Sequence, residues 1–271
     1  YSHASRTSGF YRKMSSLSYD HLTRIGIISY EPCLQFLARE PLSGVLKPPA
    51  KPSVGAASKE ANGRGTKDIP SVGVGKLRVL ALHGHAQSAS RFKGKIAAVT
   101  KEAKSLAEFD FIDGPFHVPH CEHSLENNLG EAFTWIDMSQ SGELGQGTCM
   151  NYAGVEQSFD AVLRADCDGI IAFSMGAGVL ASLLCHPEHG QKLRQRLRFV
   201  GLFSGYIPSD PRLRDWINSA GYITDLPTFF CIGQGDEEIS PDKSDELAAR
   251  FDEAVIFRHD GGHVVPASIR K

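Results

Sequence analysis

Short apolar runs separated by polar and glycine-rich stretches are the main pattern along this chain. Each run has four to seven residues, which is the length of a buried strand, and several are rich in branched or aromatic side chains. Segments between the runs place apolar residues three or four positions apart, which predicts amphipathic helices. The pattern predicts strands at 77–82, 109–112, 170–173, 197–203, 226–232 and 254–258, and helices at 89–104, 154–164, 179–184 and 241–251.

This alternation of strands and helices predicts the fold class. Strands connected through helices form a mostly parallel, doubly wound α/β sheet with helices on both faces. In such sheets the carboxyl ends of the strands meet at one edge, where ligands bind. The residues that follow each predicted strand are therefore the first place to look for chemistry.

Ser174 follows the apolar strand Ile170–Phe173 directly and precedes a helical pattern. A serine at a sharp strand-to-helix turn, flanked by small residues, is typical of a nucleophile elbow. The small residues here are Ala172 and Gly176, so the pattern is A-x-S-x-G, where the usual first residue is glycine. The sequence context therefore predicts Ser174 as a nucleophile, with a simple helix N-cap as the alternative.

A serine nucleophile needs a base, and the base needs an orienting acid. Asp236 comes soon after the predicted strand 226–232, and His263 soon after the predicted strand 254–258. The order Ser174, acid, histidine is that of α/β-hydrolases. The prediction is a Ser174, Asp236 and His263 triad.

Other residues compete for the two downstream roles. The acid could instead be Glu237, Asp242 or Asp245, although Asp236 follows its strand most directly. His259 competes with His263 as the base. The two glycines just before His263 allow the loop to fold back toward the sheet edge, which favours His263.

A tetrahedral oxyanion also needs backbone donors. The predicted donors are the N–H groups of Met175, at the start of the elbow helix, and of His85, in the loop after the first strand, where His83 is predicted to be structural. Apolar walls for an acyl chain are predicted from aromatic residues in the loops, namely Phe116, Trp135 and Tyr206.

The N-terminal quarter has a different composition. Residues 1–30 hold four basic residues and one acid among many Ser and Thr, which resembles an organelle transit peptide, and residues 41–75 are rich in Pro, Gly, Lys and Ser. We predict a disordered or targeting extension and linker at 1–75 and a folded domain at 76–271. The expected location is the cytoplasm, with the nucleus as a further site and an organelle as the alternative.

Composition and charge exclude several classes of function. The formal net charge of −2 gives no reason to expect a nucleic-acid partner, and no apolar run approaches the ~20 residues that span a bilayer. Six cysteines without C-x-x-C spacing indicate free thiols in a reducing compartment, and Cys231 is predicted to be buried in a strand. The histidine-rich loop 117–123 matches no standard zinc spacing, so no metal and no cofactor are predicted.

Seven stretches together resemble one family, the α/β-hydrolases typified by a yeast serine hydrolase and the vertebrate ovarian-cancer-associated esterase. They are L-A-L-H-G-H-A-Q-S at 80–88, F-I-D-G-P at 111–115, Y-A-G-V-E-Q-S-F-D at 152–160, G-I-I-A-F-S-M-G-A at 169–177, F-V-G-L-F-S-G-Y at 199–206, G-Q-G-D at 233–236 and H-D-G-G-H-V-V-P at 259–266. The resemblance spans 77–266 and implies an α/β-hydrolase fold.

The same resemblance implies the reaction. The family's nucleophile, acid and base match Ser174, Asp236 and His263, and the expected substrates are small-molecule esters or thioesters with small to medium acyl groups. The family often has glutamine where this chain has Met175, and it normally continues through a further helix beyond Lys271, so a truncated C-terminus is expected. The alternative function is a ligand-binding or scaffold module that has lost turnover.

Overall fold

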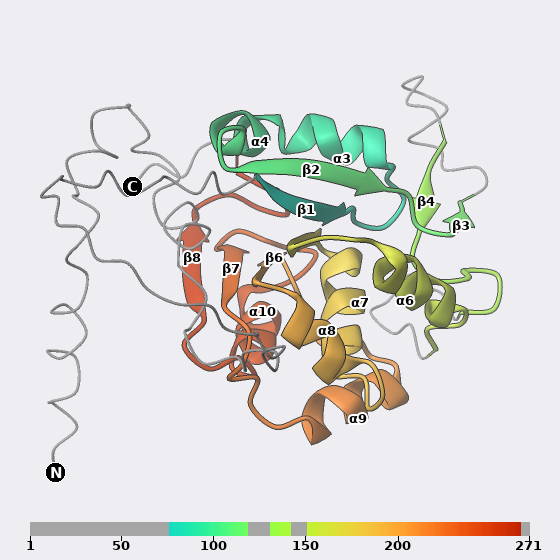
Figure 1. Ribbon diagram of the computed structural model, residues 1–271. Coiled ribbons are helices and arrows are strands. Elements are labelled where there is room, and N and C mark those ends of the chain that lie inside the picture. Colours follow the sequence, from blue (N-terminus) through green and yellow to red (C-terminus); the bar gives the residue numbers. More distant parts are fainter. Residues whose placement is uncertain (1–75, 119–130, 142–150, 267–271) are drawn as a thin grey trace, which may run out of the picture.

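A parallel β-sheet of six strands forms the centre of the computed structural model, which describes residues 76–118, 131–141 and 151–266 (Figure 1). The predicted extension at 1–75 lies outside the described residues. The strands are β1 (Leu77–Leu82), β2 (Ala107–Ile112), β5 (Gly169–Phe173), β6 (Phe199–Phe203), β7 (Thr228–Gly233) and β8 (Val255–His259). They pair in the order β2-β1-β5-β6-β7-β8, and every pairing is parallel.

Helices cover both faces of this sheet, as the alternating pattern predicts. They are α3 (Ala89–Lys95), α4 (Ala97–Ala103), α6 (Val155–Arg164), α7 (Met175–Leu184), α8 (Gly190–Arg196), α9 (Pro211–Ser219) and α10 (Pro241–Ala248). Helices α3 and α4 lie against one face, and α6 to α10 lie against the other (Figure 1). The predicted doubly wound α/β fold is therefore confirmed.

The central strand β5 explains why the core is built around Ser174. All five residues of β5 are buried, as are all ten residues of α7. A helix that is apolar on every side belongs in the interior of a protein. Strand and helix together hold the turn between them rigidly, and that turn is residue 174.

The structure differs from the predicted elements in three respects. The single helix predicted at 89–104 is two short helices, because the backbone leaves the helical region at Ile96 (φ −101°, ψ 17°) while its side chain is buried in the sheet-face cluster. Helices α8 and α9 were not predicted. A two-stranded antiparallel pair, β3 (Phe116–His117) and β4 (Phe133–Thr134), also forms in the region predicted only as loops and apolar residues.

Candidate active site

Ser174 occupies a strained turn between β5 and α7. Its backbone has φ 53° and ψ −119°, a conformation that L-residues rarely adopt. Strained backbone of this kind is concentrated at functional sites. The Ser174 N–H donates to the carbonyl of Phe203 on β6 at 2.9 Å, which fixes the turn to the neighbouring strand. The turn has the strand, turn and helix context predicted for a nucleophile elbow.

Small residues around Ser174 allow α7 to pass close to β1. A Cβ atom on Gly176 would lie 2.5 Å from the carbonyl oxygen of His83, closer than real Cβ contacts come. Only glycine therefore fits at this position without a shift of the helix. Ala172, where the family pattern has glycine, is fully buried in the core between Leu82 and Leu202, so its single methyl group is accommodated.

His263 lies in the loop after β8 with its imidazole beside Ser174. Nε2 of His263 is 2.9 Å from Oγ of Ser174, within hydrogen-bond reach, although the two residues are 89 positions apart in the chain. The ring lies against Phe173 at 4.8 Å between centroids, and the side chain is 12% exposed. The imidazole is thus oriented by packing and largely shielded from solvent.

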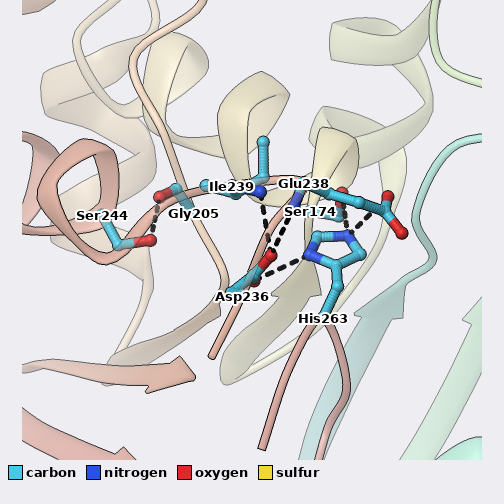
Figure 2. A network of polar contacts seen from close by, with 7 residues as sticks. All are labelled: Ser174, Gly205, Asp236, Glu238, Ile239, Ser244 and His263. Carbon is cyan, nitrogen blue, oxygen red and sulfur yellow. Dashed lines mark hydrogen bonds and ion pairs between the residues drawn. The ribbon is translucent and has the colours of Figure 1, made fainter. Parts of the chain in front are cut away.

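Asp236 lies in the loop after β7 and contacts the other nitrogen of the same ring. Its Oδ2 is 2.8 Å from Nδ1 of His263, while its Oδ1 accepts from the backbone N–H groups of Glu238 and Ile239 at 3.0 and 2.9 Å (Figure 2). The carboxylate therefore holds the tautomer that carries a proton on Nδ1, which leaves Nε2 as an acceptor for the Ser174 hydroxyl.

The pKa of Asp236 lies below the ordinary aspartate value. Burial is the largest influence and would raise this pKa, but hydrogen bonds from His263 and from the Ile239 N–H together outweigh it. The hydroxyl of Ser204 also faces the carboxylate and lowers the pKa further, although this buried hydroxyl makes no regular hydrogen bond within the described part of the chain. Asp236 is therefore an ionised, fully oriented partner for the imidazole at neutral pH.

The competing acids and base are occupied or placed elsewhere. Asp245 pairs with Arg258 at 2.6 Å, while Asp242 and Glu237 are exposed. Nδ1 of His259 accepts the N–H of Gly261 at 3.1 Å, so this histidine holds the glycine loop that precedes His263. Of the alternatives left open by the sequence, the geometry favours Asp236 and His263.

Thr134 joins the two residues predicted to supply oxyanion donors. Its hydroxyl donates to Sδ of Met175 at 3.1 Å, and Nδ1 of His85, also at 3.1 Å, is then positioned to donate to it. Burial lowers the pKa of His85, and the nearby Glu238 only partly opposes this, so the ring is neutral in this contact. The fully buried Thr134 side chain thus connects the loop after β1 to the first turn of α7.

We expect Thr134→Val to lower kcat for an aryl ester about fivefold while leaving KM nearly unchanged. Valine keeps the volume of threonine but loses the hydroxyl, and a hydrogen bond of this kind is worth roughly 1 kcal/mol. The matched control is Thr228→Val, because the Thr228 hydroxyl is also buried but binds the carbonyl of Leu226 at the far end of β7. Equal kcat values for the two variants would show that Thr134 has no role in the site.

The three residues predicted to line a pocket differ in their burial. Trp135 is fully buried, its Nε1–H donates to the carbonyl of His83 at 2.7 Å, and its ring packs on the imidazole of His83. The prediction that Trp135 lines a pocket is therefore wrong, since its indole belongs to the core. Phe116 is half-buried against Gly154, and Tyr206 is half-buried with its hydroxyl 2.8 Å from that of Tyr152.

Two structural predictions are confirmed. His83 is fully buried, with Nε2 accepting the N–H of Gly114 at 3.0 Å and Nδ1 2.6 Å from the carbonyl of Gly84, so it is a structural residue. Cys231 is buried in β7, and among the described residues Cys231, Cys167 and Cys185 form no disulfide. Most of the histidine-rich loop, from residue 119 onward, lies outside the described residues.

Backbone strain is concentrated at this edge of the sheet. Of the four described non-glycine residues with positive φ, Ala86, Ser174 and Ser204 each lie just past the carboxyl end of β1, β5 or β6. The strands β1, β5 and β6 are adjacent in the sheet, and Ser174, after β5, begins the hydrogen-bonded chain to His263 and Asp236. Such backbone positions persist only where the surrounding structure enforces them.

The family model described as "Serine hydrolase (FSH1)" matches residues 73–271. The chain belongs to this family. The match spans every described element and the whole Ser174, Asp236 and His263 arrangement. The chain is accordingly a serine hydrolase of the α/β-hydrolase class, and the resemblance seen in its motifs is confirmed.

Curated relatives in this serine hydrolase family carry esterase names. "Esterase C25G4.2" of Caenorhabditis elegans is 31% identical over 199 residues, which cover 71% of this chain and 87% of the relative. "Esterase OVCA2" of Bos taurus is 32% identical over 210 residues, covering 71% and 90% of the two chains. Both matched segments span more than four fifths of the relatives' own length.

Among solved structures, that of the Bacillus cereus carboxylesterase is similar to this chain. The two share 18% sequence identity with a TM-score of 0.46, and the match covers 70% of this chain and 82% of that chain. Within the described ranges, no helix of the hydrolase combines the length and hydrophobicity needed to cross a bilayer.

One charged residue beside Ser174, Asp236 and His263 was not predicted from the sequence. Oε2 of Glu238 lies 3.6 Å from Nε2 of His263. Glu237 and Glu238 are adjacent in the sequence, and no local pattern indicates which of them turns toward the imidazole. Only the path of the loop after Asp236 decides this.

Proposed function

We propose that this hydrolase cleaves carboxylic esters or thioesters of small to medium acyl groups through a Ser174–His263–Asp236 triad and an acyl-enzyme. The observation that carries the proposal is the continuous hydrogen-bonded chain from the Ser174 hydroxyl, through both nitrogens of His263, to the buried carboxylate of Asp236. Ester hydrolysis by a serine nucleophile needs this geometry.

The proposed reaction begins when Oγ of Ser174 attacks the acyl carbonyl and gives its proton to Nε2 of His263. Asp236 stabilises the resulting imidazolium and keeps it oriented. The tetrahedral intermediate carries its negative charge near the first turn of α7, where the backbone N–H of Met175 has no helical acceptor. The N–H of His85 is the proposed second donor, and each donor is worth roughly 3 to 4 kcal/mol to the transition state.

Collapse of this intermediate breaks the bond to the alcohol or thiol, which leaves with the proton held on Nε2 of His263. The acyl group remains on Ser174. Water then gives a proton to His263 and attacks the acyl carbonyl, and the acid is released as Ser174 recovers its proton. These steps use only side chains and backbone groups of this chain together with water.

Stopped-flow hydrolysis of p-nitrophenyl esters tests the proposal. We expect a burst of p-nitrophenol, with an amplitude near one equivalent of enzyme, for at least part of an acyl series from acetate to decanoate, because the activated p-nitrophenyl leaving group makes acylation faster than deacylation and the acyl-enzyme accumulates. Neutral N-acetylcysteamine thioesters with the same acyl groups measure the preference between ester and thioester. A folded sample that hydrolyses none of these compounds would overturn the proposal.

A further inference from the structure

A second carboxylate lies on the open side of the imidazole. Asp236 and Glu238 lie on opposite sides of the His263 ring, with Glu238 on the Nε2 side together with Ser174 (Figure 2). The two acids differ sharply in accessibility, because the side chain of Asp236 is 1% exposed and that of Glu238 is 74% exposed. Asp236 is thus enclosed by protein, whereas Glu238 faces whatever approaches Nε2.

The backbone of Glu238 is fixed relative to the reacting groups. Its N–H and that of Ile239 both donate to Oδ1 of Asp236, whose other oxygen contacts His263. The loop that carries Glu238 is therefore anchored on the same carboxylate that orients the imidazole. The Glu238 side chain starts from a defined position, although its end is in solvent.

Two titratable side chains from other elements interact with Glu238. Glu238 interacts electrostatically with His85, in the loop after β1, and with Lys95, at the end of α3. The Lys95 ammonium lies 5.8 Å from the centre of the Phe173 ring, and burial lowers its pKa while Glu238 partly opposes that shift. Among the described side chains, Glu238 forms no direct ion pair with Lys95. Its contact with His263 leaves most of the side chain exposed, so a cation from solvent can approach the carboxylate.

We propose that Glu238 forms a leaving-group subsite that favours esters whose alcohol part carries a cationic centre two or three atoms from the ester oxygen. The inference rests on the proposed function, in which Nε2 of His263 gives its proton to the leaving oxygen across a hydrogen bond of about 3 Å. The Glu238 carboxylate oxygen is 3.6 Å from the same Nε2. It therefore lies within reach of a substituent carried by the alcohol part of the ester. An ammonium group placed there gains a Coulomb attraction that an uncharged group of the same shape lacks.

The test compares butyrylcholine with 3,3-dimethylbutyl butyrate, which differ only in having a quaternary nitrogen or a carbon at one position. The measured quantity is the ratio of their kcat/KM values. We expect the parent to prefer the choline ester, and Glu238→Gln to lower the ratio about three- to tenfold, as suits one partly screened charge at short range. The ratio should also fall for the parent when salt is raised, and much less for Glu238→Gln.

Two further variants control this comparison. Glu237→Gln removes the same charge from the neighbouring exposed residue and should leave the ratio close to that of the parent. Lys95→Gln removes the nearby cation and should raise the ratio, because Lys95 repels an incoming ammonium group. An equal ratio in Glu238→Gln and the parent would overturn the inference.

Hydrolysis of p-nitrophenyl butyrate is measured in parallel so that two failures can be distinguished. If the parent cleaves the aryl ester but shows no preference for the choline ester, or does not cleave it, the inference about Glu238 is wrong and the proposed function stands. If the folded parent cleaves none of the three esters, the proposed function fails and the subsite proposal falls with it.

Discussion

Replacing Ser174 with alanine is expected to abolish labelling by a fluorophosphonate probe and to lower kcat for aryl esters about 10⁶-fold, as removal of a triad serine does elsewhere. The reason is geometric. The Ser174 hydroxyl is the one oxygen that the structure places 2.9 Å from Nε2 of His263, so no other described side chain can take its part in acyl transfer. Gel fluorescence of labelled protein and steady-state kinetics measure the two effects.

Ser182→Ala is the matched control for this experiment. Ser182 lies on the same helix, is fully buried, and donates to the carbonyl of Gly178 at 2.8 Å without contacting His263. This variant should label like the parent. Labelling of Ser174→Ala at the parental rate would mean that the probe reports a different nucleophile.

Replacing Asp236 with asparagine is expected to lower kcat about 10⁴-fold at neutral pH. Asparagine preserves the shape of the side chain but loses the negative charge that stabilises the imidazolium. Its amide can also donate to Nδ1 of His263, which favours the tautomer with a proton on Nε2, where that nitrogen no longer accepts from Ser174. Kinetics with an aryl ester measure the loss. Asp245→Asn is the control, since it breaks only an exposed ion pair with Arg258.

The same variant has a pH-dependent effect on stability. Because the pKa of Asp236 is lowered in the folded protein, its ionisation contributes stability that is present above the unfolded aspartate pKa of about 3.9 and is lost as the pH falls through the folded value. The difference in free energy of unfolding between parent and Asp236→Asn should therefore shrink below about pH 4. A difference that grows on acidification would mean that Asp236 is not stabilised as an anion.

The arrangement of Ser174, Asp236 and His263 was predictable because it follows from strand order. Each residue comes soon after a strand, and parallel strands bring their carboxyl ends to one edge whatever the intervening sequence. The sheet order places β5, β6, β7 and β8 side by side, so residues far apart in the chain meet. A pattern of apolar runs contains this information.

Contacts that depend on an irregular loop path were not predictable. Thr134 reaches His85 and Met175 because its segment folds back over the loop after β1, where the N–H of Phe133 donates to the carbonyl of Gln87 at 2.6 Å. No periodic pattern of apolar residues predicts that the segment around Thr134 folds back over this loop. The error at Trp135 has a related cause, since an aromatic residue in a loop looks the same in sequence whether it lines a pocket or fills the core.

The two unpredicted helices, α8 and α9, differ in the strength of their sequence signals. Helix α9 begins with Asp210 as its N-cap, accepting the N–H of Leu213 at 3.2 Å, and with a proline in its first turn. That combination is a recognisable helix start. Helix α8 has only Gly190 and Leu193 buried, which is too weak a pattern to predict a helix.

Positive φ angles at Ala86, Ser174 and Ser204 lower the stability of this enzyme, and at Ser174 the strained residue is also the proposed nucleophile. Each such position costs on the order of 1 to 3 kcal/mol, while a whole domain is stable by only about 5 to 15 kcal/mol. Directed evolution for heat resistance alone would therefore favour glycine at all three positions. At residue 174 the heat-resistant descendant would be inert, so a library that is screened for melting temperature needs an activity screen beside it.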